Sequence, residues 1–153
     1  MTRTGAAAAD SARDSLLNEG ILPVQEIRAA IGSGMIHAAA PITEAQMQPA
    51  SLDLRLGSRA WRVQSSFLPG ADMRVEDKLG RLAMHQIDLT GGAVLERGCV
   101  YIVELQESLR LSDGLSAMAN PKSSTGRLDI FTRLIADHAS EFEAVPDGYH
   151  GPL

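Results

Sequence analysis

Ala119-Asn120-Pro121-Lys122-Ser123-Ser124-Thr125-Gly126-Arg127-Leu128 is the stretch around which the chain is organised. Strand-like apolar runs lie on both sides, and proline and glycine favour a turn between them. The stretch carries an ammonium group, a guanidinium group that matches phosphate oxygens, and three hydroxyl groups. This composition suits a loop that holds an anionic ligand, although the spacing is not that of a Walker A loop. An ordinary Ser/Thr-rich turn with two surface cations explains the same residues equally well.

The totals of the chain indicate one domain in a reducing, cytoplasmic setting. With 153 residues it is long enough for a sizeable core, and its net charge of −5 gives no electrostatic footprint for a nucleic acid polymer. No apolar stretch is long enough to span a membrane, so we expect no membrane partner. The single cysteine, Cys99, begins an apolar run and is predicted to be a buried thiol.

The chain divides into two parts by composition. Residues 1–20 are predicted to be a disordered leader, because the first fourteen residues are rich in Ala, Ser and Thr and contain acidic residues without the apolar segment of a signal peptide. Residues 21–153 are predicted to form the folded domain. The last residues read as the start of a strand, so we expect this domain to be truncated at its C-terminus.

Short strands dominate the predicted secondary structure. A helix is expected over residues 21–32 and a second, small one over 75–82. Strands are expected over residues 48–57, 60–64, 93–96, 98–105, 109–111 and 128–136, and from residue 152. This pattern predicts a mainly β barrel or jelly roll of the β-clip type, with a short N-terminal helix and one small additional helix.

The clearest strand pattern is that of residues 48–57. The three leucines at positions 52, 54 and 56 alternate with polar residues, which predicts one buried face and one polar face. Asp53 and Arg55 fall on the polar face. We expect this face to be solvated, with an ion pair across a loop or subunit contact as the alternative.

Three blocks of the sequence resemble dCTP deaminase, a member of the dUTPase-like β-barrel superfamily. The resemblance covers roughly residues 21–153, and the long connection between Ser51 and Leu89 is similar to a long form in which two such barrels are fused. The blocks are the early strand Pro49-Ala50-Ser51-Leu52-Asp53-Leu54-Arg55-Leu56-Gly57, the phosphate loop Lys122-Ser123-Ser124-Thr125-Gly126-Arg127-Leu128, and the turn Val145-Pro146-Asp147-Gly148-Tyr149-His150-Gly151.

The resemblance implies hydrolytic deamination of dCTP to dUTP and ammonia, a step in the supply of dUTP and dTMP. It implies no catalytic metal, with Mg²⁺ bound only together with the substrate triphosphate. The residues agree that zinc chemistry is absent, since zinc deaminases need H-x-E and P-C-x-x-C, and this chain has one cysteine and no histidine that begins H-x-E. Water must then be activated by a carboxylate acting as general base.

Site residues follow from the resemblance. Ser123 matches a serine that contacts phosphate and helps to place the attacking water, and Ala136 matches an alanine whose backbone binds the base and the water. Lys122 stands where the family usually has arginine, and His138 stands where it has an arginine near the base pocket. The remaining matches are two triphosphate ligands, Ser124 and Arg127, and the turn before the catalytic strand, Asp147, Gly148, Tyr149 and Gly151.

The resemblance places the general-base glutamate beyond Leu153. Glu141 and Glu143 lie in an acidic insertion before the turn, and we expect both to be solvated. The chain alone is therefore expected to be inactive, and the family suggests a trimer-like homo-oligomer with shared active sites. The expected ligand is dCTP, with dTTP as a candidate inhibitor.

Two other functions remain open. One is a dUTPase or a bifunctional deaminase/diphosphatase, which would hydrolyse the α–β phosphate bond with a water held by an aspartate such as Asp147. The other is a non-catalytic nucleotide-binding half of a fused protein. Products of the reaction distinguish all three, because they are dUTP with ammonia, a monophosphate with pyrophosphate, or none.

Overall fold

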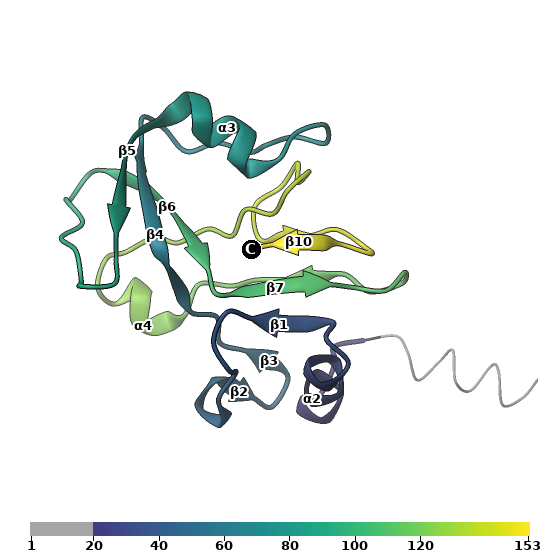
Figure 1. Ribbon diagram of the computed structural model, residues 1–153. Coiled ribbons are helices and arrows are strands. Elements are labelled where there is room, and N and C mark those ends of the chain that lie inside the picture. The colour runs from purple at the N-terminus through teal and green to yellow at the C-terminus, as the bar shows by residue number, and fades with distance from the viewer. Residues whose placement is uncertain (1–19) are drawn as a thin grey trace, which may run out of the picture.

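The computed structural model describes residues 20–153, and this part of the chain is built from short antiparallel strands with three α-helices (Figure 1). Apart from Gly20, the expected leader lies outside the described residues. The elements in chain order are α2 (Val24–Gly32), β1 (Ile36–Ala38), the 3₁₀ helix η1 (Glu44–Gln46), β2 (Met47–Gln48), β3 (Ser51–Leu52), β4 (Leu56–Val63), α3 (Val75–Leu82), β5 (Ala83–Asp88), β6 (Val100–Leu105), β7 (Glu107–Arg110), β8 (Ala117–Met118), α4 (Ser123–Gly126), β9 (Ala144–Val145) and β10 (His150–Pro152).

Two three-stranded antiparallel sheets make up most of the fold, one in the order β1-β7-β10 and one in the order β5-β4-β6. The β2-β3 and β8-β9 ladders are two-stranded. Strands β6 and β7 run on from one three-stranded sheet to the other and are separated only by Gln106, whose N–H donates to the carbonyl oxygen of Arg55 over 2.9 Å. The mainly β prediction is confirmed, and the strand that changes sheets makes a corner typical of barrels.

The two predicted helices are confirmed. Helix α2 begins after Pro23, whose carbonyl oxygen accepts the N–H of Ile27, and its buried side chains are Ile27 and Ala30. It ends before Gly34, which has a φ of +80° that favours glycine. Helix α3 forms although Gly80 lies inside it, and it buries Leu79.

The prediction of one long strand over residues 48–57 is wrong. The chain turns at Pro49 and Ala50 into the β2-β3 hairpin, and Leu54 and Leu56 are 37% and 59% exposed instead of buried. The polar residues between them are not simply solvated, as we expected. Asp53 forms an ion pair with Lys122, and Arg55 forms one with Glu107.

Glu107 is the centre of a buried polar network that joins β7 to the segment before β4. Its side chain accepts the backbone N–H of Arg55 over 2.9 Å, the Nε–H of Arg55 over 2.9 Å and the amide of Gln46 over 3.1 Å. The Arg55 guanidinium donates its other bonds to the carbonyl oxygens of Ala40 and Pro41. Because Glu107 is 1% exposed, its charge depends on these partners.

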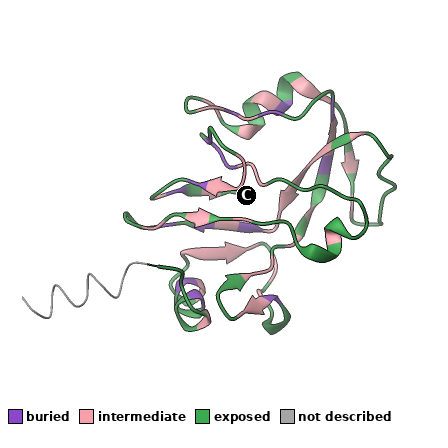
Figure 2. Cartoon of the chain, turned by 180° about the vertical axis from the view of Figure 1, so that it is seen from behind, coloured by how far each residue is buried: buried purple, intermediate pink, exposed green. Residues whose placement is uncertain are grey.

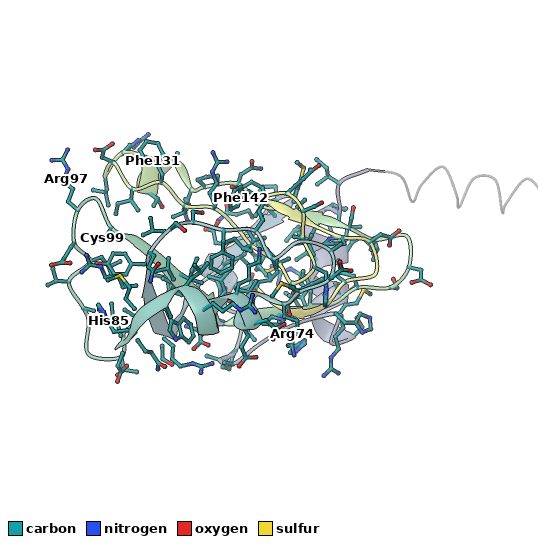
Figure 3. All side chains as sticks on the ribbon, turned by 90° about the horizontal axis from the view of Figure 1, so that it is seen from above. Arg74, His85, Arg97, Cys99, Phe131 and Phe142 are labelled. Atoms are coloured by element: carbon teal, nitrogen blue, oxygen red, sulfur yellow. The ribbon has the colours of Figure 1, made fainter. Side chains whose placement is uncertain are left out.

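Three further predictions are wrong. Residues 93–96 and 128–136 form no strand; Leu128 and Phe131 are 73% and 89% exposed, and Phe131 lies at the edge of the molecule (Figure 3). These apolar residues find no strand partner within the described chain, so periodicity alone misassigned them. Cys99 is only partly buried, because its own strand begins one residue later, at Val100.

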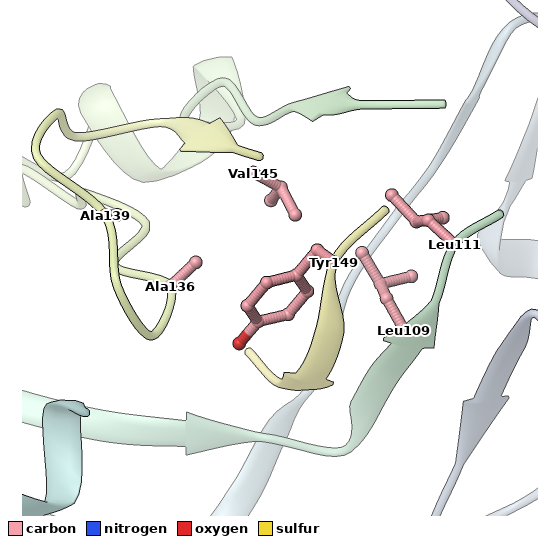
Figure 4. Close-up of a cluster of buried hydrophobic side chains, with 6 residues drawn as sticks. All are labelled: Leu109, Leu111, Ala136, Ala139, Val145 and Tyr149. Carbon is pink, nitrogen blue, oxygen red and sulfur yellow. The ribbon is translucent and has the colours of Figure 1, made fainter. Parts of the chain in front are cut away.

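Two hydrophobic clusters account for most of the buried apolar side chains, and their residues are among the purple segments of Figure 2. The smaller cluster joins β4 to α3 through Val63, Phe67 and Leu79. In the larger cluster, the ring of Tyr149 lies between the Ala136 loop and Leu109 (Figure 4). Its members are Leu109, Leu111, Ala136, Ala139, Val145 and Tyr149.

Replacing Glu107 by alanine should lower the free energy of unfolding by about 3–5 kcal/mol, because the Arg55 charge then loses its buried partner. Chemical denaturation monitored by circular dichroism measures this loss. Glu104→Ala is the matched control, since Glu104 pairs with Arg59 on the surface, where the loss should be much smaller. Equal losses in the two variants would contradict a central role for Glu107.

Candidate functional site

The predicted phosphate loop lies on a long excursion between β8 and β9. The strands pair Ala117 with Val145 and Met118 with Ala144, and the intervening chain leaves the ladder. Two backbone hydrogen bonds close its base: the Ala119 N–H donates to the Glu143 carbonyl over 2.8 Å, and the Glu143 N–H donates to the Leu134 carbonyl over 3.0 Å. The excursion therefore leaves from a fixed base and can present its polar groups to solvent.

The residues of the phosphate loop form the single helical turn α4, which had been expected to be a loop. Lys122 precedes this turn, and its carbonyl oxygen accepts the N–H of Thr125 over 2.9 Å. All residues of helix α4 are exposed except Thr125, which is partly buried (Figure 2). Within residues 20–153, no side-chain hydrogen bond engages Ser123, Ser124 or Arg127, so their donors are available to a ligand.

Lys122 already has an anionic partner. Its ammonium group forms an ion pair with Oδ2 of Asp53, and the same oxygen accepts the Gln48 amide over 3.2 Å. This contact ties α4 to the β2-β3 hairpin. Because the Lys122 side chain remains 62% exposed, it can still reach an incoming anion.

The turn over residues 145–151, which the resemblance places before a catalytic strand, holds the backbone next to Ala136. The Tyr149 hydroxyl accepts the Asp137 N–H over 3.3 Å and donates to the Pro152 carbonyl over 2.5 Å. Gly151 is required here, because a Cβ at this position would lie 2.6 Å from the Tyr149 hydroxyl oxygen. Ala136 itself is 0% exposed, and none of the hydrogen bonds among residues 20–153 uses its N–H. A buried donor without a partner within residues 20–153 calls for a bound water or ligand atom.

The other half of the turn has a structural role. One carboxylate oxygen of Asp147 accepts the Gly114 N–H over 2.7 Å. Gly148 adopts a φ of +62° and donates its N–H to the Leu115 carbonyl over 3.0 Å. These bonds dock the turn on the 112–115 segment, away from the Ala136 backbone.

Asp137 is a site-adjacent residue that the sequence interpretation missed. It is 6% exposed, and its two carboxylate oxygens accept the Val75 N–H over 2.7 Å and the Arg74 Nε–H over 3.1 Å. The hydrogen bond to Asp137 raises the pKa of the Arg74 guanidinium. The only sequence signal for Asp137 was its position between two predicted site residues, Ala136 and His138.

His138 lies on the same loop as Ala136, but it is exposed and has a φ of +61°. Its N–H donates to the Met73 carbonyl over 3.0 Å, and its Nδ1 lies 2.9 Å from the Ala71 carbonyl oxygen. Together with Glu141 and other residues of the insertion, His138 lines an open hollow of about 230 Å³.

The expectation that both acidic residues of the insertion are solvated is wrong for Glu143. Its side chain is only 14% exposed, and it accepts hydrogen bonds from the Arg133 guanidinium over 3.2 Å and the Leu134 N–H over 3.4 Å. Glu141 is exposed, as expected. Glu143 therefore stabilises the base of the excursion.

The predicted site residues thus fall into two groups. Lys122 to Arg127 lie at and beside α4, while Ala136 and His138 flank Asp137, whose N–H is bonded to the Tyr149 hydroxyl beside Gly151. No hydrogen bond among residues 20–153 links the two groups directly. In the same part of the chain, His, Cys, Asp and Glu side chains form no cluster of three or more that could hold a metal ion, and no helix is long and apolar enough to cross a membrane.

Comparison with solved structures identifies the fold. The crystal structure of 2′-deoxycytidine 5′-triphosphate deaminase from Agrobacterium tumefaciens matches 87% of this chain and 40% of its own, with a TM-score of 0.84 and 59% sequence identity. The chain is therefore a dUTPase-like β domain, as the resemblance implied.

Comparison of sequences gives the family. The model for the 2′-deoxycytidine 5′-triphosphate deaminase (DCD) N-terminal domain matches residues 18–153, and the chain belongs to this family. A "dCTP deaminase, dUMP-forming" of Beutenbergia cavernae is 32% identical over 116 residues, which are 76% of this chain and 59% of the relative. Another, of Coprothermobacter proteolyticus, is 30% identical over 98 residues, which are 64% of this chain and 52% of the relative. The chain spans about half the length of these curated relatives.

Removing the Tyr149 hydroxyl should make stability less sensitive to alkaline pH. Burial raises the pKa of the Tyr149 phenol, so its contribution is fully present below the unfolded value of about 10 and is lost as the pH rises above it. Tyr149→Phe should be less stable than the wild type near neutral pH, and the difference should shrink as the pH approaches about 11. Thermal unfolding across this pH range measures it.

Tyr101→Phe is the control, because it removes the hydroxyl of the chain's other tyrosine. This variant should keep the alkaline loss of stability. Parallel pH curves for Tyr149→Phe and the wild type would contradict the assigned burial of the phenol.

Proposed function

We propose that this chain provides the phosphate loop and part of the base pocket of a dCTP deaminase, which hydrolyses dCTP to dUTP and ammonia. The observation that carries the proposal is the family match over residues 18–153, which includes every site residue named above. The 59% identity to a solved dCTP deaminase supports it. Because the chain spans only part of its relatives, the activity is assigned to the complete protein.

The phosphate side of the proposed site is formed by the excursion. The Ser123 and Ser124 hydroxyls and the Arg127 guanidinium donate hydrogen bonds to triphosphate oxygens, and the Lys122 ammonium adds a point charge. This donor set consists of cations and hydroxyls without a carboxylate ligand cluster. It fits the triphosphate itself, so Mg²⁺ would arrive bound to the nucleotide.

The base side of the proposed site is formed by the Ala136 backbone. Its N–H is a buried donor that can bind the cytosine ring or the attacking water. In the reaction, water adds to C4 and one of its protons passes through a carboxylate to N3 as the C4=N3 bond opens. The proton of the new hydroxyl group then reaches the amine, which leaves as ammonia while the C4=O bond forms. We place this general-base glutamate C-terminal to Leu153, as the family resemblance implies.

Exposed apolar residues on the excursion support a proposal about assembly. We propose a homo-oligomer, trimer-like as in the family, in which the excursion of one subunit completes a site with groups of another. We further propose that the enzyme acts in the cytoplasm, where its nucleotide substrate is found, and that dTTP competes for the same phosphate donors. The exposed Leu128, Ile130 and Phe131 on the excursion are suited to burial in such an assembly.

A second candidate function is the formation of dUMP. It is favoured by the two curated relatives, both of which are named dUMP-forming dCTP deaminases. This reaction would add hydrolysis of the α–β phosphate bond to the deamination. Asp147 is a weaker choice for holding that second water, because one of its oxygens is engaged by the Gly114 N–H.

Incubation of the complete protein with dCTP and Mg²⁺ should release ammonia and form dUTP. Ser123→Ala should slow ammonia release about 10²–10³-fold, because a positioned donor is lost. A coupled ammonia assay and ion-exchange separation of nucleotides measure both quantities. Ser116→Ala is the matched control, since Ser116 is exposed and precedes the excursion.

The products decide between the functions. Formation of dUMP and pyrophosphate with ammonia would assign the second candidate function. Binding of dCTP without release of ammonia or pyrophosphate would instead assign the third function, a non-catalytic nucleotide-binding module.

Lys122→Ala should weaken binding of dCTP about 10–100-fold while affecting deoxycytidine little, because the lost hydrogen bond and charge act on phosphate. Isothermal titration calorimetry with both ligands separates the two effects. Lys78→Ala removes the chain's other lysine, whose ammonium donates to the Leu68 carbonyl, and should leave the dCTP affinity unchanged. Equal weakening for dCTP and deoxycytidine would place Lys122 outside the phosphate site.

A further inference from the structure

A segment before α3, residues 70–75, packs along the loop that carries Ala136. We call these residues the strap, and residues 136–139 the pocket loop. Figure 1 shows the chain before α3 beside the chain before β9. Five hydrogen bonds join them: Gly70 N–H to Ala139 O (3.1 Å), His138 N–H to Met73 O (3.0 Å), His138 Nδ1 with Ala71 O (2.9 Å), Val75 N–H to Asp137 Oδ1 (2.7 Å) and Arg74 Nε–H to Asp137 Oδ2 (3.1 Å).

We propose that the strap positions the pocket loop for catalysis, and that Arg74 and Asp137 are the positioning residues through which it acts. The inference rests on the proposed function, because it assigns the strap to the site built on the Ala136 backbone. It deepens that function by naming two residues that act on the reacting groups through Ala136.

Asp137 connects the strap to the site because it is bonded on both sides. Its carboxylate holds the first turn of α3 and the Arg74 side chain, while its own N–H is bonded to the Tyr149 hydroxyl over 3.3 Å. Since Ala136 precedes it directly, these bonds fix the peptide plane beside the Ala136 N–H. A displacement of this plane would move the donor away from the ring or the water that it is meant to bind.

Neighbouring charged groups do not take over the contact between Arg74 and Asp137. Asp77 is occupied by the Arg74 backbone N–H over 3.1 Å, and Asp137 is 6% exposed, so solvent reaches its carboxylate little. The Arg74 side chain is 55% exposed, and only its Nε is bonded within residues 20–153. Arg74 can therefore be replaced without opening a buried cavity, which makes it the better residue for a test.

The test compares Arg74→Gln with Arg81→Gln in the complete protein. Arg81 lies in the last turn of α3, whereas Arg74 directly precedes this helix. Each replacement removes one positive charge, but within residues 20–153 Arg81 has no hydrogen bond or ion pair with the pocket loop. Arg74→Gln should lower kcat for ammonia release from dCTP about 10–100-fold and change KM less than about threefold, because phosphate contacts are kept. Arg74→Lys should recover part of the loss, since it restores a cation beside Asp137.

Amide hydrogen exchange gives a readout that does not depend on activity. Arg74→Gln should speed exchange across residues 136–139 about tenfold, while Arg81→Gln should not. If Arg74→Gln leaves both kcat and this exchange unchanged, or if its kcat, KM and exchange equal those of Arg81→Gln, the strap has no positioning role. If the wild type releases no ammonia from dCTP while the exchange still responds, the proposed function fails and the strap is only a structural contact.

Discussion

The rest of the fold depends on the hydrogen bonds that the buried Glu107 carboxylate accepts. Glu107 lies on β7, the strand shared between β1 and β10, and its bonds to Arg55 and Gln46 fix the segment that leads into β4. That segment also carries Asp53, which holds Lys122 at the start of α4. Because an unpaired carboxylate could not stay at 1% exposure, the network fixes one arrangement of these segments. The position of the phosphate loop thus depends on a charge that is remote from it in sequence.

Two different constraints hold the two halves of the proposed site. The part of the excursion around α4 is mostly exposed, so it presents solvent-facing donors to a triphosphate. The Ala136 backbone is instead fixed through the next residue, Asp137. The Asp137 N–H donates to the Tyr149 hydroxyl, and the Asp137 carboxylate accepts the Val75 N–H. This difference fits the chemistry, since phosphate needs charge and many donors, whereas a reacting ring and water need fixed positions.

Local patterns predicted the elements whose partners are near in sequence or strongly apolar. Helices α2 and α3 and strand β6 followed from turn residues and apolar spacing, and the three motifs gave the family. The errors come from tertiary pairing. The alternation of Leu54 and Leu56 is typical of a strand with one buried face. The side chains of Asp53 and Arg55 instead form ion pairs with residues more than fifty positions away, and these pairs hold the segment in another conformation. Asp137 is buried by hydrogen-bond donors more than sixty positions away, while Glu143 is buried by donors across its own loop, where the sequence predicted a strand.

Both departures from the family pattern find a partner in this chain. Lys122 stands where the family usually has arginine, so an ammonium group replaces a planar guanidinium group. An ammonium has three N–H donors without a fixed plane, and it can therefore bind Asp53 and a phosphate oxygen at the same time. His138 has its ring against the Ala71 carbonyl, so it serves the contact with residues 70–75 and does not point a second cation at the substrate. Both residues are therefore compatible with the proposed site: Lys122 would keep a positive charge at the phosphates, and His138 ties the loop that carries Ala136 to residues 70–75.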